Sequence, residues 1–158
     1  INAVLRKGNV LVTGAGSSMS GYGSELERTM FVGEPSPEQT RFFNYMMDVQ
    51  QIAFDNIRPG RKCSDVDKAV RAYYEKNGLW KYWRHHTGHA LGLLGHEGPF
   101  FDEGDDTTML PGMVFSVEPG LYVPGMGGFR HSDTVVVTKT GMDFITYYPR
   151  ELEKLICG

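Results

Sequence analysis

Cysteine is scarce in this chain of 158 residues, which holds only Cys63 and Cys157. The two lie far apart and not in the Cys-x-x-Cys spacing typical of many zinc sites. The sequence therefore supports neither a secreted disulfide framework nor a zinc knuckle, and the expected compartment is a reducing cytoplasm.

Long hydrophobic runs and an excess of one charge are also missing. No apolar stretch approaches the roughly 20 residues of a membrane span, and residues 1–7 lack the order of a signal peptide. Sixteen basic and nineteen acidic residues nearly balance, with no basic block. This balance argues against a nucleic-acid or membrane partner and favours a small or neutral substrate.

The length of the chain fits one domain with one hydrophobic core. The sequence starts without Met and runs straight into a strand-like segment. We therefore expect residues 1–158 to be a piece of a longer protein.

Extended segments and glycines fill the first part of the chain. Residues 9–13 predict a strand that ends at the glycine-rich run 14–18, and a second extended segment follows Gly21 toward residues 30–32. Gly14-x-Gly16 lacks the third glycine and the following helix of a phosphate cradle. Hairpin and turn geometry is therefore the expected role of these glycines.

Two helices follow. Ser36-Pro37-Glu38-Gln39 predicts a helix start with a hydroxyl N-cap and a capping-box Gln, and the helix should end near residues 59–60. A second helix is expected from Ser64 to Gly78, a residue suited to a C-terminal cap. Apolar residues recur at helical spacing in the first helix, at Phe42, Met46, Val49 and Ala53.

Beyond the second helix, glycine, proline and histidine become dense. Extended segments are expected at residues 113–123, 129–138 and 144–148, with a turn at Gly141. Strands, two helices and strands again predict an α+β fold, with the helices on one side of a mostly antiparallel sheet.

The histidines indicate where the chemistry lies. All five fall in less than a third of the chain, at positions 85, 86, 89, 96 and 131, together with Glu118 and Asp133. A lone histidine is more often a core residue than a ligand, but four within twelve positions favour a functional site.

Glu118 is the leading candidate carboxylate. Residues 114–117 read as a buried strand that delivers Glu118 beside the rigid Pro119-Gly120 turn; the alternative is a solvent-facing glutamate on an edge strand. Hydrolysis of an amide needs a nucleophilic water, a group that moves its proton and donors for the oxyanion, and histidines and glutamates on facing strands can supply all three. No Gly-x-Ser-x-Gly elbow supports a serine nucleophile.

Four ordered motifs resemble the pita-bread hydrolases, the family of aminopeptidase P, prolidase, methionine aminopeptidase and creatinase. The resemblance runs from about residue 10 to the C-terminus. It is carried by Gly21-Tyr22-x-Ser24-Glu25-Leu26-x-Arg28-Thr29, Thr87-Gly88-His89-x-Leu91-Gly92 with His96-Glu97, Pro111–Tyr122 and Gly128-Phe129-Arg130-x-x-Asp133-Thr134. It implies the pita-bread α+β fold, of which residues 1–158 would be the C-terminal part. The upstream part of that catalytic domain, which brings a further active-site histidine in the family, is absent from this sequence.

The resemblance also implies a metal site that is incomplete. The peptidases of the family hold two ions with two aspartates, one histidine and two glutamates. His89 and Glu118 match two of these ligands, and Glu25 stands at the second aspartate. Gly14 and Ser132 occupy the other two positions, so we expect at most one divalent ion, manganese, zinc, cobalt or iron, held by Glu25, His89 and Glu118. A metal-free site is the alternative.

The remaining matches fit more than one chemistry. His85 and His96 match histidines that line the substrate pocket of the peptidases and steady the tetrahedral intermediate, and Arg130 matches a positioning arginine. Glu27, within Leu26-Glu27-Arg28-Thr29, matches a substrate-binding glutamate of creatinase, which works without a metal. The substrate-binding set is thus Glu27, His85, His96 and Arg130.

The sequence therefore predicts a hydrolase that cleaves the peptide bond ahead of proline in short peptides. His85, His96, Glu118 and Arg130 are the expected catalytic residues, and the resemblance implies a homodimer. Two alternatives stay open. One is a creatinase-like, metal-free amidinohydrolase acting on a small guanidino compound or amide, and the other is a non-catalytic peptide-binding relative.

Overall fold

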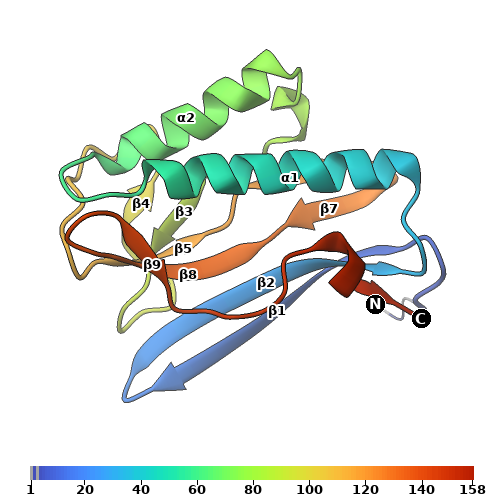
Figure 1. Ribbon diagram of the computed structural model, residues 1–158, viewed down its shortest axis with the longest axis horizontal. Coiled ribbons are helices and arrows are strands. Elements are labelled where there is room, and N and C mark those ends of the chain that lie inside the picture. Colours follow the sequence, from blue (N-terminus) through green and yellow to red (C-terminus); the bar gives the residue numbers. More distant parts are fainter. Residues whose placement is uncertain (1, 3) are drawn as a thin grey trace.

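A long β-hairpin opens the fold in the computed structural model, which describes residue 2 and residues 4–158 (Figure 1). Strand β1 (Val10–Met19) pairs antiparallel with β2 (Tyr22–Val32) along its whole length. The chain reverses at Ser20 and Gly21, whose φ angles are 53° and 86°. Gly21 suits this turn because it has no Cβ to clash at positive φ.

The expectation of a turn at residues 14–18 is wrong, because these residues continue β1. Gly14 lies opposite Glu27, and Gly16 lies opposite Glu25. A Cβ added to Gly14 would lie 3.3 Å from Cγ of Glu27. The glycine therefore serves close side-chain packing across the hairpin rather than a change of direction.

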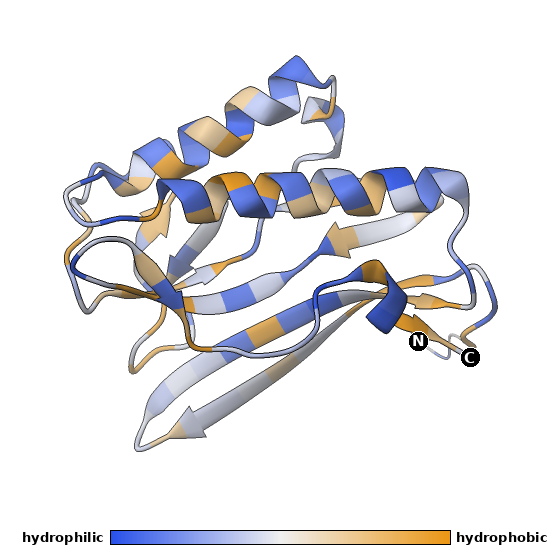
Figure 2. Ribbon diagram, viewed as in Figure 1, coloured by the Kyte–Doolittle hydropathy of each residue, from blue (hydrophilic) through white to orange (hydrophobic). Residues whose placement is uncertain are grey.

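The two predicted helices are confirmed. Helix α1 (Pro37–Asn56) starts with the full capping box between Ser36 and Gln39. Helix α2 (Cys63–Lys76) is followed by Gly78 at a φ of 65°. Figure 2 shows that hydrophobic and hydrophilic residues alternate along both helices, as expected for helices with one buried face.

The described residues form an eight-stranded sheet and a separate two-stranded sheet. The main order is β1-β2-β8-β5-β3-β4; in addition, β9 pairs with β8, and β10 pairs with β2 in the one parallel pairing found in the described residues. β6 pairs with β7 in the small sheet. The bounds are β3 (Gly88–Ala90), β4 (Glu97–Phe101), β5 (Val114–Val117), β6 (Gly120–Val123), β7 (Gly127–Arg130), β8 (Ser132–Val137), β9 (Met142–Phe144) and β10 (Ile156–Cys157), with short 3₁₀ helices η1 (Trp80–Tyr82) and η2 (Leu152–Lys154).

The later strands are shorter than the sequence predicts. The expected segment 113–123 is interrupted after β5 by Glu118 and Pro119, and 129–138 is interrupted by His131 between β7 and β8. The strand expected at 144–148 is wrong, since β9 ends at Phe144. Beyond it, the carbonyls of Tyr148 and Pro149 accept hydrogen bonds from Arg28 instead of a neighbouring strand.

Both helices cover one face of the main sheet (Figure 1). The hydrophobic core lies between the helices and the sheet. Its residues are almost completely buried and include Phe31, Phe42, Met46, Phe115 and Val135. Successive strand residues point to opposite faces, so Ser116, between the core residues Phe115 and Val117, points away from the helices. The α+β prediction is confirmed, and the face without helices is free to carry polar chemistry. None of the helices in the described residues is both long and apolar enough to cross a membrane.

Candidate metal and catalytic site

Glu25, His89 and Glu118 come together from three strands on this second face. Glu25 lies in β2, His89 lies in β3, and Glu118 directly follows β5. Nε2 of His89 is 3.2 Å from Oε1 of Glu118 and 3.6 Å from Oε2 of Glu25. His89 and Glu118 are buried, so most of the cluster is shielded from water.

The sheet register sets these positions. His89 lies opposite Ser116, and the backbone N–H of Glu118 donates to the carbonyl of Thr87 at 2.9 Å. This bond fixes the chain where β5 ends. Glu118 is thus held beside the interior strands, and the alternative of a solvent-facing edge glutamate is wrong.

Burial and neighbouring charges shift the ionisation of all three side chains. Burial and the nearby Glu118 charge raise the pKa of Glu25. Burial would also raise the pKa of Glu118, but the hydrogen bond from His89 and the charge of Arg130 lower it on balance. For His89, burial acts to lower the pKa, yet Glu118, the Ala90 carbonyl and Glu25 together raise it. Near neutral pH the site therefore keeps Glu118 ionised.

The three side chains fit one divalent ion. One ligand atom from each lies within 4.8 Å of the others. Nδ1 of His89 is 3.0 Å from the carbonyl oxygen of Ala90, an arrangement that directs Nε2 toward the carboxylates. One imidazole and two carboxylates form a donor set that zinc, manganese and iron accept.

Ser132 and Gly14 stand at the two positions where the sequence lacks a metal ligand, and among the residues that the structure describes neither is replaced by a nearby carboxylate ligand. Ser132 is a neutral donor here, and its hydroxyl gives a hydrogen bond to Oε1 of Glu25 at 3.0 Å. It also lies 2.7 Å from the hydroxyl of Ser116. Gly14 offers no side chain, and Glu27 packs against it. Neither position supplies a carboxylate for a second ion.

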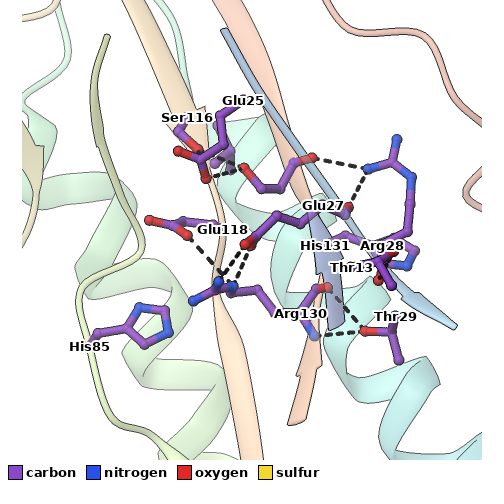
Figure 3. A network of polar contacts seen from close by, with 12 residues as sticks. Thr13, Glu25, Glu27, Arg28, Thr29, His85, Ser116, Glu118, Arg130 and His131 are labelled. Atoms are coloured by element: carbon purple, nitrogen blue, oxygen red, sulfur yellow. Dashed lines mark hydrogen bonds and ion pairs between the residues drawn. The ribbon is translucent and has the colours of Figure 1, made fainter. Parts of the chain in front are cut away.

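Arg130 occupies the space beside Glu118. It contacts Glu27 through Nε and Nη2 at 2.5 and 2.6 Å, and its Nε lies 3.6 Å from Oε2 of Glu118 (Figure 3). Its Nη1 donates to the hydroxyl of Tyr122 at 3.0 Å. A fixed positive charge therefore stands next to the candidate base.

His85 and His96 border the same cluster. Nε2 of His85 is 2.6 Å from the Tyr122 hydroxyl, so His85 connects to Arg130 through one phenol. A Cβ on Gly120 would come within 2.9 Å of that hydroxyl, and the glycine leaves the space open. The ring of His96 lies 3.8 Å, centroid to centroid, from that of His89. All seven residues predicted for the site thus lie in one connected group.

Sequence reasoning gave no role in the site to two members of this group, Tyr122 and His86. Tyr122 follows Glu118 across the Pro-Gly turn, and that spacing was the available signal. His86 offers a ligand atom near His96 and Glu118, and its presence in the histidine cluster was the only indication. Burial lowers the pKa of His86.

Asp133 does not belong to this cluster. It points to the helix-covered side, where it forms an ion pair with Arg28 at 2.7 Å and accepts a hydrogen bond from Gln50 of α1 at 3.2 Å. Alternation along β8 places it on the face opposite Ser132. Its role is in the packing beneath the site.

Most of this chain is similar in sequence to known proteins. The model of metallopeptidase family M24 matches residues 1–139. The chain is 40% identical over 149 residues to the probable dipeptidase PepE of Mycobacterium tuberculosis, and 33% identical over 148 residues to the Xaa-Pro dipeptidase of Pyrococcus horikoshii. Each alignment covers 94% of this chain but only 40% and 42% of the respective relative. The chain thus spans about two fifths of the length of these relatives.

Solved structures give the same result for the fold. The prolidase from Pyrococcus horikoshii superposes with a TM-score of 0.92 at 32% identity, covering 96% of this chain and 44% of that one. The X-Pro aminopeptidase from Thermotoga maritima gives a TM-score of 0.93 at 28% identity, covering 99% and 44%. The predicted pita-bread fold is confirmed.

Proposed function

The chain belongs to metallopeptidase family M24, and we propose from this membership and its site that it hydrolyses the peptide bond ahead of proline in short peptides. The relatives named above carry names of this kind. The observation that carries the proposal is Glu118, a buried carboxylate held beside His89 and Glu25. The activity of the whole protein is part of this proposal, because the chain spans about two fifths of its relatives.

In this proposal each residue of the site has a separate role in hydrolysis. Glu118, whose pKa is lowered chiefly by His89 and Arg130 against the effect of burial, takes a proton from the attacking water and returns it to the leaving nitrogen. Arg130, His85 and His96 offer positive charge or hydrogen bonds where the oxyanion develops. A divalent ion, when bound by Glu25, His89 and Glu118, supplies Lewis acidity and lowers the pKa of water.

One contact weighs against the creatinase-like alternative. The carboxylate of Glu27 already receives the guanidinium of Arg130 at two points. A guanidino substrate would have to displace this internal partner. Peptide hydrolysis needs no such exchange.

We further propose a cytoplasmic homodimer. Cys63 and Cys157 are both free, in keeping with a reducing compartment. Met19, Tyr22, Leu93 and Leu94 are exposed. Their segments touch, because Gly23 N–H donates to the carbonyl of Gly92. Light scattering of the wild type and of Leu93→Glu tests this, since a charge in a shared apolar surface should shift the protein toward the monomer.

Hydrolysis assays test the main proposal. The purified protein, supplied with Mn²⁺ or Zn²⁺, is offered Ala-Pro, Ala-Ala and creatine, and we expect Ala-Pro to be cleaved fastest. Glu118→Gln should lower kcat about 100-fold or more, whereas Glu75→Gln, at an exposed position of α2, should not change it. Creatine turnover without peptide cleavage would replace this function, and peptide binding without any turnover would favour a binding module.

A further inference from the structure

A second group of ligand-forming side chains shares Glu118 with the first. His86, His96 and Glu118 each offer one ligand atom, and these atoms lie within 4.8 Å of one another. The family resemblance assigns His96 to the substrate and gives no role to His86. These three residues therefore form a donor set beyond the one already described.

The two histidines are placed to bind an ion. Their ring centroids are 5.5 Å apart, and each lies 5.5 Å from the ring of Phe100, which forms an apolar wall beside them. In the described part of the chain, His85 and His89 have hydrogen-bonded ring nitrogens, whereas no such bond engages His86 or His96. The ring nitrogens of this pair are free to coordinate.

His96 is exposed, so an ion can reach this donor set from solvent on the His96 side. His86 lines a cavity of about 550 Å³ together with Phe100, Asp102, Asp105 and Asp106. The carboxylates on its wall attract cations. An entry path is one requirement of a metal site.

We propose that His86, His96 and Glu118 form a second position for a single divalent ion, an alternative to Glu25, His89 and Glu118. Both positions need the same Glu118 carboxylate, and Arg130 adds a positive charge 3.6 Å from it. Glu118 would be the single carboxylate shared by two ions, and the Arg130 charge beside it disfavours the addition of a second cation. The ion thus occupies one position or the other. This proposal concerns metal binding alone and does not require that the protein hydrolyse peptides.

The identity of the ion selects the position. Two imidazoles and one carboxylate favour nickel, copper and zinc, whereas one imidazole and two carboxylates favour manganese. Ni²⁺ should therefore bind mainly through His86 and His96, and Mn²⁺ mainly through Glu25 and His89.

Titrations of the metal-free protein with Ni²⁺ alone and Mn²⁺ alone, followed by calorimetry, test this. His86→Gln should weaken Ni²⁺ binding about tenfold or more and change Mn²⁺ binding less than about threefold, since it removes one ligand from one position. Glu25→Gln should do the reverse. Glu118→Gln should weaken both ions.

His85→Gln is the matched control. It removes the neighbouring histidine, whose ring contacts Tyr122 and belongs to neither donor set, so both affinities should stay within about threefold. His96→Gln repeats the test at an exposed side chain, where loss of folding is not expected, and circular dichroism checks every variant. Equal loss of Ni²⁺ binding in His85→Gln, or unchanged Ni²⁺ binding in both His86→Gln and His96→Gln, would overturn the second position.

Discussion

Arg130 forms a two-point ion pair with Glu27, Nε to Oε2 at 2.5 Å and Nη2 to Oε1 at 2.6 Å. The pair joins β7 of the small sheet to β2 of the main sheet. Both side chains are mostly buried, so the contact is shielded from solvent. It fixes the guanidinium beside Glu118 and Tyr122.

Glu27→Gln should therefore destabilise the protein by about 1–3 kcal/mol, because it leaves Arg130 without its charged partner. Urea denaturation of Glu27→Gln, Arg130→Met and the double variant measures the coupling between the two side chains. We expect a coupling free energy of about 1 kcal/mol or more. Strict additivity of the two single changes would contradict the structural role of the pair.

A second buried ion pair lies on the helix-covered side. Arg28 and Asp133 are 2.7 Å apart, with 2% and 1% of their side chains exposed. Asp133 also accepts hydrogen bonds from Gln50 and Thr146, and Nε of Arg150 lies 3.6 Å from it. Asp133→Asn should lower the free energy of unfolding by about 3–5 kcal/mol, since it leaves a buried arginine without its carboxylate.

The matched control for this change is Asp143→Asn, at an exposed position of β9. Urea denaturation should show its effect within about 0.5 kcal/mol of zero. Equal effects of the two substitutions would argue that the Arg28–Asp133 pair contributes nothing particular.

Local chemistry made the helices predictable. The capping box of Ser36 and Gln39 depends on residues three apart, so sequence alone located the start of α1. Glu118 was predictable for a similar reason, because a short apolar strand and a Pro-Gly turn flank it. The resemblance to a known family added Glu25 and His89 to the predicted ligands. It also indicated that Gly14 and Ser132 stand where two ligands have been lost.

Contacts between distant strands were not predictable. Glu27 and Arg130 are 103 positions apart, and only the sheet arrangement brings them together. The short strands β3 and β4 lie in a stretch where glycine and histidine hide the alternation of polar and apolar residues. For the same reason, the proximity of His86 to Glu118 had no sequence signal of its own.

Metal content provides a further prediction. The purified protein should hold at most one divalent ion per chain, because Gly14 and Ser132 provide no carboxylate for a second. Elemental analysis after saturation with Mn²⁺ or Zn²⁺ and removal of free ions measures this. Glu118→Gln, which disrupts both donor sets, should retain far less. Two stoichiometric ions in the wild type would show that the ligand assignment is wrong.

His131 links stability to pH. It is fully buried, and neither ring nitrogen has a hydrogen-bond partner among the described residues. Burial, followed by the charges of Arg28 and Arg150, lowers its pKa from 6.5 to about 3. Between these values the unfolded chain binds a proton that the folded protein excludes. Stability should therefore fall as the pH drops below about 6.5, by about 1.4 kcal/mol per pH unit, with no contribution from His131 above it.

Replacing this side chain tests the linkage. His131→Leu should remain within about 1 kcal/mol of the wild type at pH 7.5, because it removes two nitrogens without partners. Between pH 6.5 and 5 the free energy of unfolding of this variant should fall by about 2 kcal/mol less than that of the wild type. Phe43→Leu alters the ring that packs 5.4 Å from His131 without removing a titrating group, so it should lower the whole curve and keep its slope. Urea denaturation at a series of pH values measures all three proteins, and equal slopes for His131→Leu and the wild type would show that His131 does not bind the proton on unfolding.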